Sequence, residues 1–171
     1  TAAKFLSNPL IAQSGVTAAI LASGGMTGPK AIFESPDGLR PLFRQDANFD
    51  LLAQPIEGTY SINLAHMKAF PCLATGQAES AAAIEMHRVL GGRTDHIEKF
   101  DVIMADYPMV HDQQGDQARR YPDSREAADH SFYFIAAIAM MEGTLSMRSY
   151  DNERWNDPVV KAPMAKGRMQ I

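Results

Sequence analysis

The chain has 171 residues, of which 46% are hydrophobic and 21% are charged, and these values are typical of a globular protein with a sizeable core. Its 16 Lys and Arg against 20 Asp and Glu give a net charge of −4, which argues against a general nucleic-acid-binding protein. The single cysteine, Cys72, excludes an internal disulfide and a cysteine-based zinc site within one chain.

The N-terminal segment is predicted to form one helix. Apolar residues recur at helical spacing from Leu10 to Ala22, and Pro9 is expected in the first turn, where its missing N–H costs little. Gly24 and Gly25 would end this helix in left-handed conformations. The segment that follows, residues 28–41, contains turn signals such as Pro36-Asp37-Gly38.

The central segment resembles an α/β unit. Residues 60–64 alternate between polar and apolar and predict a strand, and residues 75–90 predict a helix that stops at Gly91-Gly92. Residues 100–104 predict a second strand. A strand–helix–strand segment with a connection of this length favours a parallel or mixed sheet, so we expect an α/β (α+β) fold.

The C-terminal third predicts a long polar loop followed by helices. Residues 106–129 show no clear period, and a loop of this length is often functional. Residues 124–142 predict one long helix with Ser124 as its N-cap and Gly143 as its C-cap. A shorter helix is expected over residues 157–165, interrupted by Pro163.

Two lysines are the first candidates for chemistry. Lys68 lies between apolar residues just before Pro71, and partial desolvation there would ease proton transfer; it could equally pair with a substrate carboxylate or be an exposed lysine on the polar side of a strand. Lys4 precedes the first apolar helix and could hold an anion or transfer a proton. The alternative is a solvated lysine in a frayed terminus.

His66, His130 and Arg125 are further candidates. In a strand, His66 and Lys68 would face the same side, because they are two residues apart. His130 precedes the last long helix and could instead be a structural histidine that hydrogen-bonds a loop. Arg125 suits bidentate carboxylate capture, although a solvated loop residue is the alternative. The remaining histidines are scattered and no HExxH motif occurs, so we expect no metal site.

Three sequence blocks occur in order along the chain. They are Lys4-Phe5-Leu6-Ser7-Asn8-Pro9-Leu10 with Gly25-Met26-Thr27-Gly28-Pro29, then Lys68-Ala69-Phe70-Pro71-Cys72, then Arg125-Glu126-Ala127-Ala128-Asp129-His130-Ser131. Together they resemble the MmgE/PrpD family, the 2-methylcitrate dehydratase / cis-aconitate decarboxylase superfamily. The resemblance covers nearly the whole chain.

The resemblance implies an active site between an all-helical domain and a smaller α/β domain. On this basis residues 1–28 are expected to belong to the helical domain, 29–123 to the small α/β domain and 124–171 to a helical return segment. The expected function is a lyase of the 2-methylcitrate dehydratase type, which removes water from a small tricarboxylate without a cofactor. A cis-aconitate-type decarboxylase, a dicarboxylate epimerase and a non-catalytic structural subunit are the alternatives.

The resemblance also assigns roles to single residues. Two family lysines correspond to Lys4 and Lys68, which are therefore the expected catalytic residues. Substrate binding is expected from His66, Tyr107, Arg125 and His130, with Tyr121 as the alternative to Tyr107.

The expected partners follow from the same resemblance. The family's other catalytic residues come from an N-terminal helical domain that this chain does not match. The chain is therefore expected to be a fragment or subunit that is completed by an N-terminal part or a second polypeptide. We expect a homodimer that acts on a di- or tricarboxylate and does not bind nucleic acid or membranes. No apolar stretch is long enough to span a membrane and no signal peptide is visible, so a cytoplasmic or mitochondrial matrix location is expected.

Overall fold

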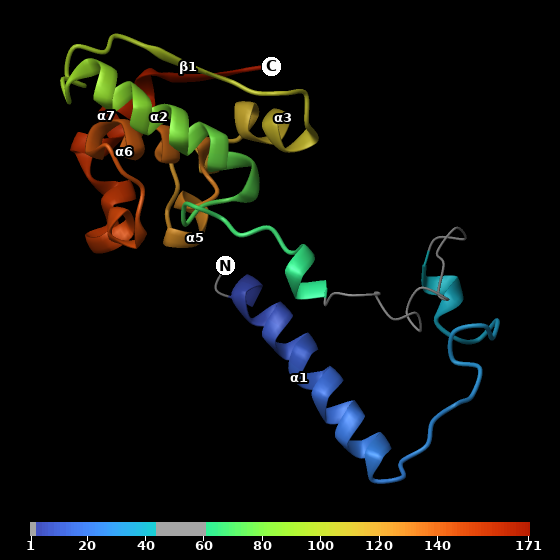
Figure 1. Cartoon of the computed structure of the whole chain (residues 1–171). Coiled ribbons are helices and arrows are strands. Elements are labelled where there is room, and N and C mark those ends of the chain that lie inside the picture. Colours follow the sequence, from blue (N-terminus) through green and yellow to red (C-terminus); the bar gives the residue numbers. More distant parts are fainter. Residues whose placement is uncertain (1–2, 44–60) are drawn as a thin grey trace. The chain divides into compact units, whose positions relative to one another are not determined.

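The computed structural model describes residues 3–43 and 61–171 (Figure 1). The chain divides into two compact units between His66 and Met67. The described part of the N-terminal unit consists of residues 3–43 and 61–66, and the C-terminal unit is residues 67–171.

The N-terminal unit contains the long helix α1 (Ala3–Ser23). The predicted helix is confirmed, but Pro9 lies inside it rather than in its first turn, because the helix begins six residues before the proline. The helix ends as expected for a glycine C-cap: Gly25 has a φ of 92°, and the N–H of Met26 donates to the carbonyl of Leu21 at 3.0 Å.

The rest of the N-terminal unit is irregular. The predicted turn is confirmed, since the N–H of Gly38 donates to the carbonyl of Ser35 at 2.9 Å. The strand predicted over residues 60–64 is wrong where it is described, because Ser61–Leu64 forms a short 3₁₀ helix; Tyr60 lies outside the described residues. Four alternating residues fit a 3₁₀ turn as well as a strand, and here the backbone bonds locally, with Ala65 N–H donating to Ile62 O at 3.2 Å.

The C-terminal unit is built around helix α6 (Phe132–Glu142). Every residue from Phe132 to Met140 is buried, because this stretch has no charged side chain and is surrounded on all sides. Helix α2 (Gln77–Leu90) packs against α6, and His87 Nδ1 lies 2.8 Å from the carbonyl oxygen of Met140. The two helices end at Gly91 and Gly143 in left-handed conformations, as predicted.

A two-stranded parallel sheet covers part of this core. Strand β1 (Phe100–Ile103) pairs with β2 (Gly167–Gln170), and Phe100 lies opposite Gly167. The strand predicted near residue 100 is confirmed, but its partner is the C-terminal strand and not the predicted strand at 60–64. Helix α7 (Pro158–Lys166) leads directly into β2 and continues through Pro163, which was expected to interrupt it.

The polar segment 106–129 is helical in part, so the predicted long loop is wrong. It forms α3 (Pro108–Gly115), α4 (Gln117–Arg120) and α5 (Arg125–Ala128). Capping side chains begin two of these helices: Asp116 accepts from the N–H of Ala118 at 2.8 Å, and Ser124 accepts from the N–H of Ala127 at 3.3 Å. Such short capped helices lack the apolar periodicity on which the prediction depended.

The long helix predicted over residues 124–142 is two helices, α5 and α6. The interruption lies at Asp129–Ser131, where Ser131 Oγ accepts a hydrogen bond from the N–H of Phe134 at 3.1 Å and caps α6. Ser124 caps α5 and Gly143 ends α6, so both predicted ends are correct.

These helices and the parallel sheet confirm the α/β fold class. In residues 3–43 and 61–171 no helix is both long and apolar enough to cross a membrane.

Candidate functional site

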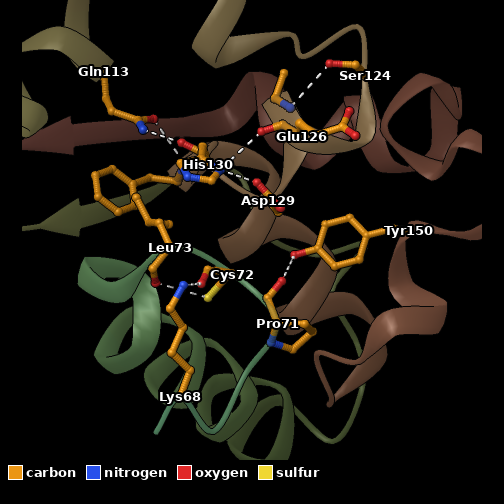
Figure 2. Close-up of polar contacts among 12 residues, drawn as sticks. Lys68, Pro71, Cys72, Leu73, Gln113, Ser124, Glu126, Asp129, His130 and Tyr150 are labelled. Atoms are coloured by element: carbon orange, nitrogen blue, oxygen red, sulfur yellow. Dashed lines mark hydrogen bonds and ion pairs between the residues drawn. The ribbon is translucent and has the colours of Figure 1, made fainter. Parts of the chain in front are cut away.

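The loop that precedes α2 contains the candidate residue Lys68 (Figure 2). Lys68 lies in irregular backbone and not at a strand end, and its side chain is exposed, without the burial that the apolar neighbours suggested. Its Nζ donates a hydrogen bond to the carbonyl oxygen of Cys72 at 2.8 Å. An ammonium group has three N–H donors, so this bond orients the head group while using only one of them.

Gln77, at the start of α2, organises the same loop through its side-chain amide. Its Oε1 accepts from the N–H of Phe70 at 3.0 Å, and its Nε2 donates to the carbonyl oxygen of Phe70 at 3.0 Å. The same Nε2 lies 3.2 Å from Cys72 Sγ and 3.3 Å from the carbonyl oxygen of Leu73. One side chain thus satisfies backbone groups on both sides of Pro71. These bonds hold the Cys72 carbonyl, which Lys68 contacts, in place.

The buried thiol of Cys72 belongs to this network. Its Sγ lies 3.4 Å from Ser80 Oγ, and Ser80 Oγ donates to the carbonyl of Gly76 at 2.7 Å. Burial raises the pKa of the Cys72 thiol, and the negative charge of Glu79 adds to this effect. A raised pKa disfavours the reactive thiolate, so the structure favours Cys72 as a packing residue.

His130 lies beside the loop, in the interruption between α5 and α6. The N–H of Leu73 donates to the carbonyl of Asp129 at 2.9 Å, which joins the two segments. His130 Nδ1 pairs with the Asp129 carboxylate and lies 3.1 Å from the carbonyl oxygen of Glu126 (Figure 2). The carbonyl of His130 accepts a hydrogen bond from Nε2 of Gln113. These contacts hold His130 in one orientation next to the Lys68 loop.

Tyr150, from the C-terminal part of the chain, contacts the same loop. Its hydroxyl donates to the carbonyl oxygen of Pro71 at 2.9 Å, and its ring packs against Phe134 at 5.5 Å between centroids. Burial raises the pKa of Tyr150, so this hydroxyl stays protonated and can donate at neutral pH. The guanidinium of Arg125 lies over the Tyr150 ring, 5.7 Å from its centroid.

The structure therefore brings three of the six predicted site residues to one loop: Lys68, Arg125 and His130. Tyr107 precedes α3 with an exposed side chain and contributes none of the hydrogen bonds above. Lys4 and His66 belong to the N-terminal unit. Lys4 is part of helix α1, and His66 is an exposed residue outside any helix or strand. The expectation that His66 and Lys68 share one face of a strand is wrong, because neither lies in a strand.

Sequence reasoning missed Gln77 and Tyr150. Gln77 is a polar residue at a helix start, which is common and carries no signal on its own. Tyr150 contacts Pro71 across 79 positions of sequence, and no local pattern predicts such a pairing.

Metal ligands do not gather at this site. Among the residues that the structure describes, no group of three or more His, Cys, Asp or Glu side chains is placed to hold a metal ion. The positively charged groups in the described part of the site belong to side chains, and such groups can bind carboxylates directly.

Comparison with known proteins gives the family of the chain. The family model for the MmgE/PrpD C-terminal domain matches residues 70–171. Over 167 residues the chain is 29% identical to cis-aconitate decarboxylase of Mus musculus, covering 93% of this chain and 33% of that protein. It is 26% identical to cis-aconitate decarboxylase of Homo sapiens over 168 residues, with the same coverage.

The chain spans about a third of the length of the curated relatives that it matches. The family model covers more than half of the chain and includes helices α2 to α7 and both strands, and it begins two residues after Lys68. The chain therefore belongs to the MmgE/PrpD family.

Proposed function

We propose that this chain contributes the Lys68 loop to the active site of a lyase that acts on a small tricarboxylate. The observation that carries the proposal is the 2.8 Å hydrogen bond from Lys68 Nζ to the Cys72 carbonyl, in a loop held by Gln77 and Tyr150. An exposed ammonium whose position is set by the backbone can bind a substrate carboxylate with little loss of side-chain entropy.

Decarboxylation of cis-aconitate is the reaction we place first, because the matched relatives carry that name. In such a reaction a carboxylate leaves as CO₂, and the electron pair left on carbon takes up a proton. Dehydration of 2-methylcitrate stands second. It needs the same binding of the substrate carboxylates, together with removal of a proton alpha to one of them.

The proposed roles divide between two lysines and a histidine. Lys68 and Lys4 hold carboxylates or donate protons, and His130 keeps the segment between α5 and α6 in place beside the Lys68 loop. The group that moves the proton at carbon would come from the family's helical domain or from a partner chain, which includes a second copy in a homodimer.

The proposal is tested by assaying the protein together with any chain that co-purifies with it. CO₂ release from cis-aconitate and water loss from 2-methylcitrate are measured separately, so the two reactions are distinguished. Native mass spectrometry of the same sample reports the expected N-terminal partner or homodimer. Absence of turnover with every di- and tricarboxylate in the complete assembly would overturn the proposal.

The role of Lys68 is tested with a matched pair of lysine variants. Lys68→Met should lower turnover by about a hundredfold, the effect typical of losing one charged group that stabilises a reacting anion. Lys161→Met is the control, since Lys161 belongs to α7 and bonds to Asn156, and this change should leave turnover unchanged. Turnover that survives both Lys4→Ala and Lys68→Met would instead support a structural subunit.

A further inference from the structure

Glu79 is a buried carboxyl that the proposed lyase chemistry does not use. It lies in the first turn of α2 and is only 8% exposed. Neither of its carboxylate oxygens has a hydrogen-bond partner in the part of the chain that the structure describes. A buried polar group without a partner is unfavourable for folding, so its presence calls for a ligand or another functional reason.

Glu79 lines a cavity of about 550 Å³ between α2, β1 and α6, the elements seen together in Figure 1. This volume is within the usual range for small-molecule sites. Ala82 and Met86 of α2, Phe100 of β1 and Met140 of α6 form much of its apolar wall. The cavity therefore combines an apolar interior with one carboxyl whose acceptors are unused.

The polar groups around the cavity favour a ligand that donates hydrogen bonds. Lys99, which directly precedes β1, and Asp101 of β1 line it and are exposed, whereas α6 contributes only Ala136 and Met140. The Cys72 thiol, in the loop before α2, is close enough to sense the charge of Glu79. Burial raises the pKa of the Glu79 carboxyl well above its ordinary value, and an ammonium head group that donates to this carboxyl would stabilise its ionised form.

We propose that this cavity binds a small primary ammonium compound with an apolar body, whose head group donates hydrogen bonds to Glu79. An ammonium has three N–H donors and can satisfy both orphan oxygens at once. An apolar chain of a few carbons would lie against Met86, Phe100 and Met140. The proposed tricarboxylate substrate is excluded from this cavity by its charge, so the site is independent of the lyase proposal.

Methyl groups of two methionines provide a direct readout. We would titrate n-butylammonium chloride into the full chain carrying ¹³C-methyl methionine and follow the resonances of Met86 and Met140. Both should shift and saturate, while Met109 of α3 should not, since it does not line this cavity. Butyrate, which has a chain of the same length and the opposite charge, should cause no saturable shift.

Two variants assign the binding to Glu79. Glu79→Gln should weaken n-butylammonium binding by about tenfold or more, as expected for loss of a charged hydrogen bond. Glu85→Gln on the same helix should bind like the wild type, because Glu85 is exposed and pairs with Arg88. Ala82→Leu places a larger side chain in the cavity wall and keeps the Glu79 carboxyl, so it should also weaken binding, which keeps the test valid if Glu79→Gln misfolds.

The proposal is overturned by any of three results. These are the absence of shifts at Met86 and Met140, equal affinity in the wild type and Glu79→Gln, and butyrate binding as tightly as n-butylammonium. None of these results bears on turnover of a tricarboxylate, so failure here and failure of the lyase proposal are distinguishable.

Discussion

Helices α1 and α6 both carry large apolar side chains, but their surroundings differ. In α6, Phe134 and Ile138 are fully buried, whereas in α1 Leu10 is 56% exposed and Ile20 is 65% exposed. Residues 67–171 thus contain a core of their own, formed around α6. Burial of the apolar side chains of α1 would contribute about 25 cal/mol for each Å² removed from water.

This contrast leads to the largest predicted effect, a pair of truncations to alanine. Phe134→Ala should lower the free energy of unfolding by about 3–5 kcal/mol, because it leaves a cavity in a fully packed core. Leu10→Ala should change it by less than about 0.5 kcal/mol. Urea unfolding followed by the fluorescence of Trp155 for the C-terminal unit and by far-UV circular dichroism for both units measures the two effects, and equal losses would contradict the contrast between the two helices.

A glycine at the end of α6 provides the next test. Gly143 has a φ of 66°, and a Cβ there would lie 2.6 Å from the His87 ring. Gly143→Ala should therefore destabilise the C-terminal unit by about 2–3 kcal/mol through backbone strain and displacement of His87. Gly115→Ala is the control, since a Cβ there meets nothing within 4 Å. Thermal unfolding should separate the two variants clearly.

Polar contacts hold the Lys68 loop beside the core around α6. Loss of these contacts should have a smaller effect on stability. Gln77→Leu leaves the N–H and carbonyl of Phe70 without their side-chain partner and should lower stability by about 1–2 kcal/mol. It should also lower turnover in the complete assembly, because Lys68 loses its fixed acceptor. Gln117→Leu, at an exposed position on α4, should leave both unchanged.

The smallest expected effect is that of Tyr150→Phe, at about 1 kcal/mol near neutral pH, from loss of the bond to Pro71. Its pH dependence is more distinctive. Burial raises the folded-state pKa of Tyr150 above its ordinary value of 10.0, so the unfolded chain ionises first. Its contribution to stability is fully present below pH 10 and is lost as the pH rises above that value.

Unfolding by urea between pH 8 and pH 11 measures this dependence. The wild type should lose stability above pH 10 more steeply than Tyr150→Phe, which has no phenol to ionise at that position. Tyr121→Phe serves as the control, because Tyr121 is 41% exposed and should reproduce the wild-type curve. Parallel curves for wild type and Tyr150→Phe would contradict a buried, protonated Tyr150.

Part of the candidate site was predictable from local sequence. Lys68, Arg125 and His130 stand in motif blocks that resemble the family, and the structure places all three around one loop. The contacts that hold this loop, from Gln77 and Tyr150, were not predictable. They depend on pairings of polar side chains with backbone groups, and such pairings have no sequence period.

The sequence by itself determined the helices with strong apolar patterns and their ends, as at Gly91 and Gly143. These features are decided within a few residues, by periodicity and by the ability of glycine to adopt a positive φ. Only the tertiary structure decided that β1 pairs with β2, that the polar segment before α5 is partly helical, and that Glu79 is buried without a partner. Each of these depends on which segments pack together across long stretches of chain, and local propensity does not determine that.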